Sequence, residues 1–258
     1  MRLLVCAVPV AILLGCSSAA TDGAADPTTD GFPATSGGAR SGNTTSHDPN
    51  NPATPVADAD LTEVVNVLID GNGLCTGTLI SKTMVVTAGH CLDRSSFKTW
   101  DVVAPLANGQ KSHGTQVKIF DGAYEDVAHP DVGVIILGSP ITLPSYAQLT
   151  DVTSRIAVTG KVMGTAMVRK FVDSEAPIIV VAGLEVSSGA QYGYDFGLVS
   201  KYFSQGGDSG AGLYLVENGK RTHKLIGVAR QPEPDKNLDH FTRFDAAFIA
   251  WVKALGLE

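Results

Sequence analysis

Three short strings in the sequence combine residue types that could carry out nucleophilic catalysis. His90 lies in the string TAGHC, Asp131 opens an apolar run, and Ser209 lies in the glycine-rich string QGGDSGAG. A serine hydroxyl is a poor nucleophile until a base accepts its proton, and an imidazole that titrates near neutral pH is a suitable base. A carboxylate can then hold the imidazole in the required tautomer. The three strings therefore predict a hydrolytic site.

Taken together and in the order His, Asp, Ser, the strings resemble the trypsin/chymotrypsin family of serine peptidases. Taken singly, His90 is more often a structural histidine and Asp131 a turn carboxylate, and Gly-Asp-Ser-Gly is often just a turn. The resemblance extends from about Glu63 to the C-terminus, where the string FTRF and Trp251 also match. It implies an all-β, chymotrypsin-like double β-barrel with six strands in each barrel, a C-terminal α-helix and an active site between the barrels.

The resemblance also implies a role for each matching residue. His90 would be the general base, Asp131 would orient it, and Ser209 would attack the substrate carbonyl and become the acyl-enzyme. The backbone N–H groups of Gly207 and Ser209 would form the oxyanion hole. The implied function is that of a serine endopeptidase acting on proteins or peptides, with no metal and no organic cofactor.

The cysteines are consistent with an exported domain. Cys75 and Cys91 are separated by 16 residues and flank the segment that leads to His90. An even pair in an exported domain predicts a disulfide, and the family has such a bridge beside its catalytic histidine. A metal site is the rival interpretation, but the sequence offers no further histidine nearby and no Cys-x-x-Cys string.

The sequence departs from the family in two places. Animal members are activated when cleavage frees an Ile/Val amino group that pairs with the aspartate before the nucleophile, here Asp208. The expected stretch, 48–56, reads DPNNPATPV, and Val64 lies too close to Cys75 to serve. We therefore expect either that the oxyanion hole forms without such activation or that processing occurs at another site.

The second departure is the substrate pocket. The position at the pocket base is Phe203, followed by Ser204, instead of the aspartate that trypsins use for basic side chains. The usual Ser-Trp-Gly wall is replaced by a segment with Arg230 and Gln231. Asp239 could line another wall and attract Lys or Arg, although a surface-loop acid is the interpretation that we favour.

Two other functions can be weighed. An α/β-hydrolase requires a Gly-x-Ser-x-Gly elbow followed by many further elements. Here Ala211 replaces the last glycine and only 49 residues follow Ser209, which excludes that fold. The remaining alternative is a catalytically inactive domain of the chymotrypsin fold that serves as a binding or surface lipoprotein.

The elements that must position these residues are predicted to be short strands. Many short β-branched runs separated by turn residues favour an all-β sandwich or pair of barrels. The chain closes with a helical pattern in which Asp245 is the cap and Phe248, Trp251, Val252 and Leu255 share one face. The runs are 64–69, 78–80, 84–87, 117–120, 132–137, 156–158, 178–181, 212–215 and 225–228.

The first 58 residues predict export and tethering. Residues 1–16 combine Arg2, an apolar run too short to span a bilayer and the string LLGC, which resembles a bacterial lipobox with Cys16 as the lipidated residue. An ordinary signal peptide is the alternative. Residues 17–58 are rich in Ser, Thr, Gly and Pro and predict a disordered tether, and 59–258 would be the peptidase domain.

This organisation places the protein at a bacterial cell envelope, either periplasmic or on the surface, and held to the membrane only by a lipid. Cleavage within the tether would release the domain. The 258 residues are 44% hydrophobic, which excludes a wholly disordered chain. The net charge of −7, with no basic run, argues against nucleic-acid binding. We expect a monomer.

Overall fold

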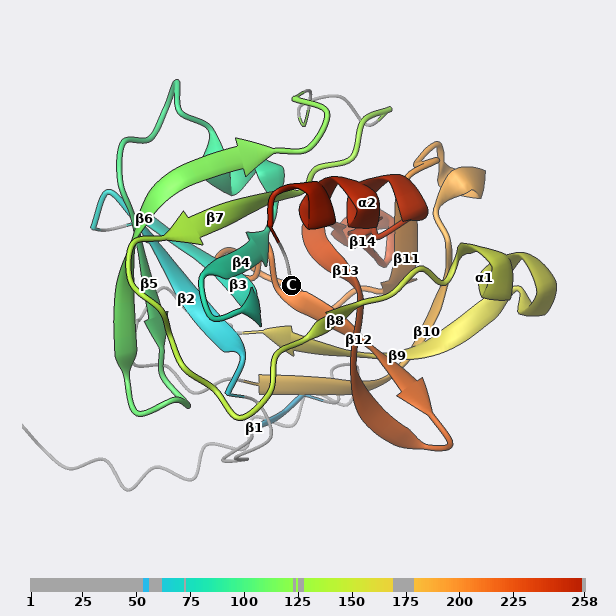
Figure 1. The fold of residues 1–258 in the computed structure, drawn as a ribbon. Coiled ribbons are helices and arrows are strands. Elements are labelled where there is room, and N and C mark those ends of the chain that lie inside the picture. Colours follow the sequence, from blue (N-terminus) through green and yellow to red (C-terminus); the bar gives the residue numbers. More distant parts are fainter. Residues whose placement is uncertain are drawn as a thin grey trace, which may run out of the picture. The chain divides into compact units, whose positions relative to one another are not determined.

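The strands of this protein form where β-branched residues recur between glycine, asparagine and aspartate turns. We describe a computed structural model that covers residues 53–55, 62–71, 73–122, 124, 128–168 and 179–256. These residues belong to one structural unit, 46–258. Figure 1 shows two groups of strands, one built from the first half of this unit and one from the second.

The first group is a closed barrel of six antiparallel strands in the order β2-β3-β4-β7-β6-β5. Its interior is apolar and includes the fully buried side chains of Leu79, Val85 and Ile135. Trp100 closes part of this core, and its indole N–H donates to the Cys91 carbonyl across 2.7 Å. The strands are β2 (Val64–Ile69), β3 (Gly73–Ser81), β4 (Met84–Thr87), β5 (Trp100–Ala104), β6 (Gln110–Ile119) and β7 (Gly133–Leu137).

The second group closes in the same way. The strands follow the order β10-β11-β14-β13-β12-β9, and pairing between β9 and β10 completes the ring. Two short strands join this barrel, since β1 (Ala53–Pro55) pairs with β10 and β8 (Gln148–Leu149) pairs in parallel with β13. The ring strands are β9 (Lys161–Val168), β10 (Ile179–Ser188), β11 (Gly197–Lys201), β12 (Gly212–Glu217), β13 (Lys220–Glu233) and β14 (Leu238–Arg243).

The helices are short. Helix α2 (Ala246–Ala254) begins where the Asp245 carboxylate accepts the Phe248 amide across 2.9 Å, which is the cap expected from the sequence. Helix α1 (Thr153–Thr159) precedes β9. The 3₁₀ helices are η2 (Gly89–Leu92), η3 (Ala190–Tyr192) and η4 (Pro234–Lys236).

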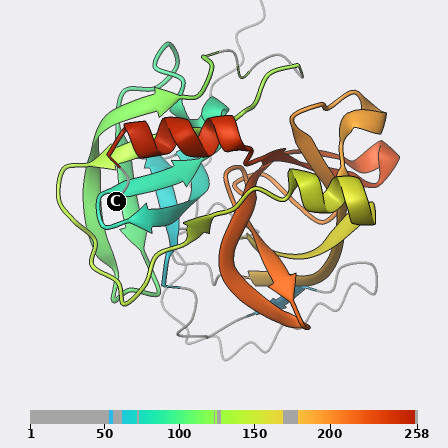
Figure 2. The same ribbon diagram turned by 45° about the vertical axis from the view of Figure 1, so that its right-hand side comes forward.

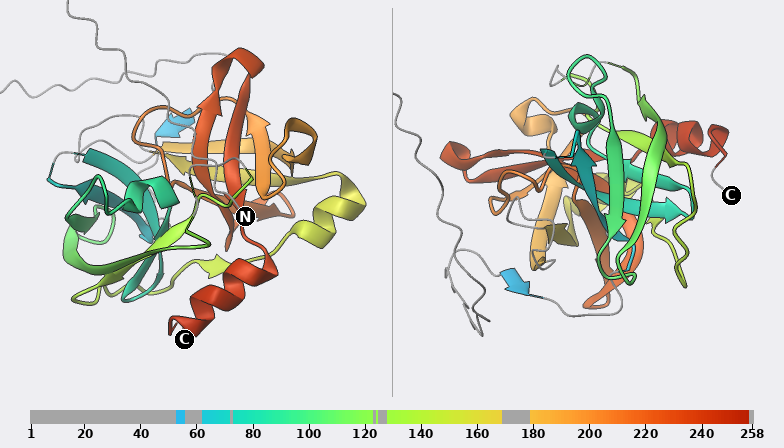
Figure 3. Two further views of the ribbon diagram at one scale, coloured as in Figure 1. Left: turned by 90° about the horizontal axis from the view of Figure 1, so that it is seen from above. Right: turned by 90° about the vertical axis from the view of Figure 1, so that its left-hand side faces the viewer.

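An apolar cluster joins the two barrels. It contains Val86 and Val134 from the first barrel, Met167 and Tyr214 from the second, and Phe248 from α2. The ribbon views in Figures 2 and 3 show the two groups of strands side by side, with α2 lying along the first barrel. Burial of such side chains is worth about 1.5–3 kcal/mol each. The cluster therefore holds the edges of the two barrels together, where the site residues lie.

The predicted fold class is confirmed, as are the C-terminal helix and most of the strands. The run 156–158 is wrong as a strand, because it lies in α1. Gly160 adopts the left-handed conformation and its amide donates to the Ile156 carbonyl, which ends a helix in the usual way. Of that run only Ile156 is buried, whereas Val158 is 86% exposed.

The sequence interpretation of the first 58 residues falls largely outside the described residues. The described exception is β1, where 53–55 lie within the predicted tether but pair with 179–181 of β10. Main-chain hydrogen bonds to a sheet edge can order a segment that has little apolar surface to bury. In the described part of the chain, no helix is long and apolar enough to cross a membrane.

The expected disulfide is confirmed. Cys75 on β3 and Cys91 in η2 are bonded, with their Cα atoms 6.4 Å apart. Their side chains are buried beside the core of the first barrel. The bridge therefore fixes η2 to the strand that runs beneath it.

Replacing both Cys75 and Cys91 by serine should lower the free energy of unfolding by about 3 kcal/mol, because the unfolded chain regains the freedom of the closed loop. Urea denaturation under oxidising conditions measures the change. Reduction of the wild-type protein should give a similar loss and is the control. An unchanged unfolding midpoint in both experiments would contradict a stabilising role.

Candidate active site

Two neighbouring strands bring His90 and Asp131 together. β4 and β7 are antiparallel, and Thr87 at the end of β4 is paired with Gly133 at the start of β7. The chain therefore leaves β4 and enters β7 at the same edge of the first barrel. His90 lies in η2 just after β4, and Asp131 lies just before β7.

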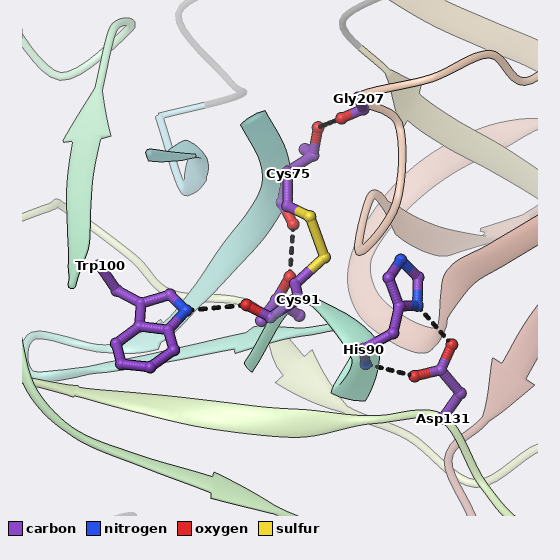
Figure 4. Close-up of a disulfide and its surroundings, with 8 residues drawn as sticks. Cys75, His90, Cys91, Trp100, Asp131 and Gly207 are labelled. Carbon is purple, nitrogen blue, oxygen red and sulfur yellow. Dashed lines mark hydrogen bonds and ion pairs between the residues drawn. A yellow bond between two sulfur atoms is a disulfide. The ribbon is translucent and has the colours of Figure 1, made fainter. Parts of the chain in front are cut away.

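The Asp131 carboxylate binds His90 through both of its oxygens (Figure 4). Oδ2 lies 2.7 Å from His90 Nδ1, and Oδ1 accepts the His90 backbone N–H across 2.8 Å. An ionised carboxylate only accepts hydrogen bonds, so Nδ1 carries the proton and Nε2 of the neutral ring is an acceptor. The Asp131 side chain is 3% exposed and that of His90 is 38% exposed. The buried Asp131 thus orients the His90 ring, and part of the ring remains accessible to solvent.

Asp131 is itself held by its neighbours. The Thr242 hydroxyl on β14 donates to the Asp131 carbonyl across 3.0 Å, which ties this loop to the second barrel. Gly89 leaves room for the carboxylate, because a Cβ there would lie 3.0 Å from Asp131 Oδ1. Neither contact was predicted from the sequence, since a threonine and a glycine at these positions look ordinary.

The turn that carries Ser209 is fastened to the first barrel through Thr76. The Thr76 amide donates to the Ser209 carbonyl across 2.8 Å, and the Thr76 hydroxyl donates to the Gly207 carbonyl across 2.9 Å. Gly210 adopts φ 82°, and a Cβ there would lie 2.1 Å from Thr87 Oγ1. A side chain at 210 would therefore push the turn away from the segment that leads to His90.

The two backbone N–H groups expected to form an oxyanion hole are available. Within the residues that the structure describes, neither the Gly207 nor the Ser209 amide donates a hydrogen bond. Gly207 adopts φ 91°, a conformation that favours glycine. Ser209 is half-buried, and its amide and that of Gly207 belong to the same turn.

Two buried carboxylates accept hydrogen bonds from the chain segment that leads to this turn. Asp208 is fully buried and accepts the Gln205 amide across 2.9 Å, among other contacts. Asp239 on β14 accepts the amides of Phe203 and Ser204, across 2.6 and 2.9 Å, and the Ser204 hydroxyl. The structure thus brings together the three predicted pocket residues.

The interpretation of Asp239 as a surface-loop acid is wrong, because its relative exposure is 1%. The sequence could not place it, since a lone aspartate carries no sign of its strand register. Burial raises the pKa of Asp239; hydrogen bonds from Ser204 and Phe203 oppose this shift, and the charge of Asp208 adds to it. Its oxygens are occupied by the chain segment that leads to Ser209.

His90 also lies close to both disulfide sulfurs. The nearest donor atoms of Cys75, His90 and Cys91 are within 4.8 Å of one another, a spacing that could suit a metal ion. Both sulfurs, however, belong to the disulfide. They are therefore not the thiolates that bind zinc.

Comparison with known proteins points to one family. The family model named Trypsin matches residues 56–252 of this chain. Chymotrypsin-like elastase family member 1 of Felis catus is 34% identical over 86 residues, which cover 29% of this chain and 31% of that protein. The Homo sapiens protein of the same name is 35% identical over 86 residues, with 29% and 32% coverage. The matched segment spans about a third of the length of these relatives.

Solved structures extend the likeness over most of the chain. A Glu endopeptidase in complex with MPD superposes with a TM-score of 0.63 at 19% identity, covering 80% of this chain and 97% of that one. The VesB protease of Vibrio cholerae superposes with a TM-score of 0.59 at 14% identity, covering 78% and 65%. At these identities the likeness concerns the fold alone.

Replacing Asp239 by asparagine should destabilise the protein by about 2 kcal/mol, because an amide would turn a donor toward the groups that now donate to the carboxylate. Urea denaturation at pH 7 measures the loss. Asp235→Asn is the matched control, since Asp235 is exposed on η4 close by. Equal stability of the two variants would show that the contacts of Asp239 contribute nothing.

Proposed function

Because the chain belongs to the trypsin family of serine peptidases, we propose that it is an active serine endopeptidase that hydrolyses peptide bonds in proteins or peptides. The observation that carries this proposal is the His90–Asp131 pair, in which Nδ1 lies 2.7 Å from Oδ2. This pair lies at the edge of the first barrel that the Ser209 turn approaches closely, because Gly210 has no side chain. The pair provides an oriented base, and the turn provides the nucleophile.

The three residues divide the proposed reaction between them. Ser209 Oγ attacks the carbonyl carbon of the substrate while His90 Nε2 takes the hydroxyl proton. The imidazolium then protonates the leaving amine, and the acyl group remains on Ser209. A water molecule, deprotonated by His90, releases the acyl group and restores the serine. Asp131 stays ionised throughout and stabilises the positive ring.

The negative oxygen of each tetrahedral intermediate needs hydrogen-bond donors. The amides of Gly207 and Ser209 are suitable, because neither has an acceptor within the described residues. Loss of one such donor typically raises the barrier by about 3–4 kcal/mol. The hydrogen bond from Thr76 to the Gly207 carbonyl supports this arrangement, since it fixes the Gly207–Asp208 peptide group, which lies between the two peptide groups that carry the donor amides.

We also propose that the oxyanion hole does not depend on a newly freed N-terminus. Three side chains hold the turn from within the described residues. Thr76 binds the Gly207 carbonyl, Asp208 binds the Gln205 amide, and Asp239 binds the segment before them. Because Asp239 is buried and accepts hydrogen bonds from Phe203 and Ser204, we assign it a role in holding this loop, and not in binding a basic substrate side chain.

Export and lipid attachment at Cys16 remain part of the proposal. They rest on the signal-like run 1–16 and its LLGC string. A diacylated Cys16 would hold the peptidase at a bacterial envelope. The disulfide supports an oxidising compartment, because such bonds are rare in the cytosol.

A fluorophosphonate probe should label the full-length protein covalently, and Ser209→Ala should abolish the labelling. The reason is that the probe reacts with a serine whose hydroxyl is activated by a neighbouring base. In-gel fluorescence measures the reaction. Ser95→Ala is the matched control, since Ser95 is an exposed serine that, among the described residues, hydrogen-bonds to Asp93 and is not part of the proposed site.

Two results would overturn the activity. Absence of labelling in the folded wild-type protein would favour the inactive binding domain of this fold. Labelling that survives Ser209→Ala would place the reactive hydroxyl elsewhere. Cleavage of a peptide library then identifies the preferred side chain in the labelled protein.

In a bacterial host supplied with an alkyne-bearing fatty acid, the protein should incorporate the label, and Cys16→Ser should lose it. Only a thiol forms the thioether to diacylglycerol, so serine cannot substitute. Cys6→Ser is the control, because Cys6 lies inside the segment that would be removed. Equal labelling of Cys16→Ser and the wild type would contradict lipidation at Cys16.

A further inference from the structure

Arg230 occupies a bulge in β13 beside the proposed base. The pairing of β13 with β14 shifts register between Ala229, which faces Phe241, and Gln231, which faces His240. Arg230 is therefore the additional residue of the bulge. Bulges of this kind redirect a side chain and are common next to active sites. The sequence marks this position only as an arginine in the segment that replaces the family's Ser-Trp-Gly wall.

The bulge directs the Arg230 side chain at Asp131. Arg230 Nε lies 3.8 Å from Asp131 Oδ2, the same oxygen that binds His90 Nδ1. The Arg230 side chain is 9% exposed. Its Nη2 donates to the Tyr124 carbonyl across 3.3 Å, and its Cζ lies 5.9 Å from the centre of the Tyr194 ring. The guanidinium is thus held in place from several directions.

We propose that Arg230 is a positioning residue whose charge beside Asp131 sets how far into acidic solution the His90–Asp131 pair remains active. This inference rests on the proposed function. Arg230 acts through Asp131 and touches no reacting atom. It shares a carboxylate oxygen with the ring that must accept the serine proton.

The physical reason is competition between two cations for one carboxylate. A protonated His90 and Arg230 would both face Asp131 Oδ2, and they repel each other in a site of low dielectric constant. In the free protein, the guanidinium therefore disfavours the imidazolium and keeps His90 available as a base at lower pH. A nearby like charge disfavours the charged form of a titrating group, and we expect a shift of about one pH unit here because both cations contact Asp131 Oδ2.

Among the residues that the structure describes, the other charged groups near the pair have partners of their own. Asp208 on the nucleophile turn is buried and accepts the Gln205 amide. His129, two residues before Asp131, pairs with Asp121 at 2.9 Å. On the far side of Arg230, His240 pairs with Glu233 at 2.9 Å, and Glu233 also contacts Lys236. These groups are unchanged in variants of Arg230, so the change isolates the guanidinium.

The test compares kcat/KM between pH 4.5 and 9 for the wild type, Arg230→Met and Arg230→Lys. Arg230→Met should move the acidic limb of the profile upward by about one pH unit, which is about a tenfold loss well below the limb. Arg230→Lys keeps the charge and should leave the limb close to that of the wild type. Arg155→Met is the matched control, since Arg155 is on α1 and pairs with Glu217.

A second neutral variant and a second measurement keep the test decisive. Arg230→Gln retains a donor for the Tyr124 carbonyl and should move the limb as Arg230→Met does, even if Arg230→Met does not fold. Titration of the His90 C2 proton by NMR follows the same protonation in a protein that cleaves nothing. Failure of wild-type labelling therefore overturns the proposed function, whereas an unmoved His90 titration in the neutral variants overturns the role of Arg230. A loss of kcat/KM equal at every pH would likewise show a merely structural role.

Discussion

The site depends on a close approach between the backbones of the two barrels at Gly210. A Cβ at this position would lie 2.1 Å from Thr87 Oγ1 and 2.2 Å from the Thr76 carbonyl oxygen. Only a residue without a side chain lets the turn of the second barrel rest on β3 and β4 of the first. Once it rests there, the Thr76 amide and hydroxyl bind the carbonyls of Ser209 and Gly207. The nucleophile is therefore positioned by the same strands that lead to the base.

The rest of the fold maintains that approach. The apolar cluster between the barrels, with α2 packed against it, holds the two sheets in contact on one side. The Thr242 hydroxyl binds the Asp131 carbonyl and links β14 to the loop before β7. The disulfide fixes η2 to β3. The proposed base, its carboxylate and the nucleophile thus lie on three separate segments. The disulfide fixes the first, Thr242 the second and Thr76 the third.

The sequence predicted the family, the fold class and the three motif residues, because local strings such as GDSG and TAGH carry their chemistry in adjacent positions. It predicted the Asp245 cap for the same reason. It could not predict Thr76, Thr242 or the burial of Asp239, since each acts on a partner that is more than thirty residues away and depends on strand register. The prediction of a strand at 156–158 was wrong because a run of three residues, two of them β-branched, decides little when a glycine can end a helix just beyond it.

The candidate site contains several buried charged side chains. Asp131, Asp208 and Asp239 are all buried, and each carboxylate accepts at least one backbone amide. In the described part of the chain, Arg230 is the one buried lysine or arginine. Removing a guanidinium from water costs several kcal/mol unless a partner compensates.

Asp131 is one of the groups that compensate Arg230, and this has a consequence for the reaction. The carboxylate must stabilise the imidazolium when the serine proton arrives, yet it already faces a cation. Without Arg230, the Asp131 carboxylate would stabilise the charged His90 ring more strongly. The ring would then also be protonated at a higher pH. The shared oxygen therefore exchanges some stabilisation of the charged ring for a larger fraction of neutral ring at low pH.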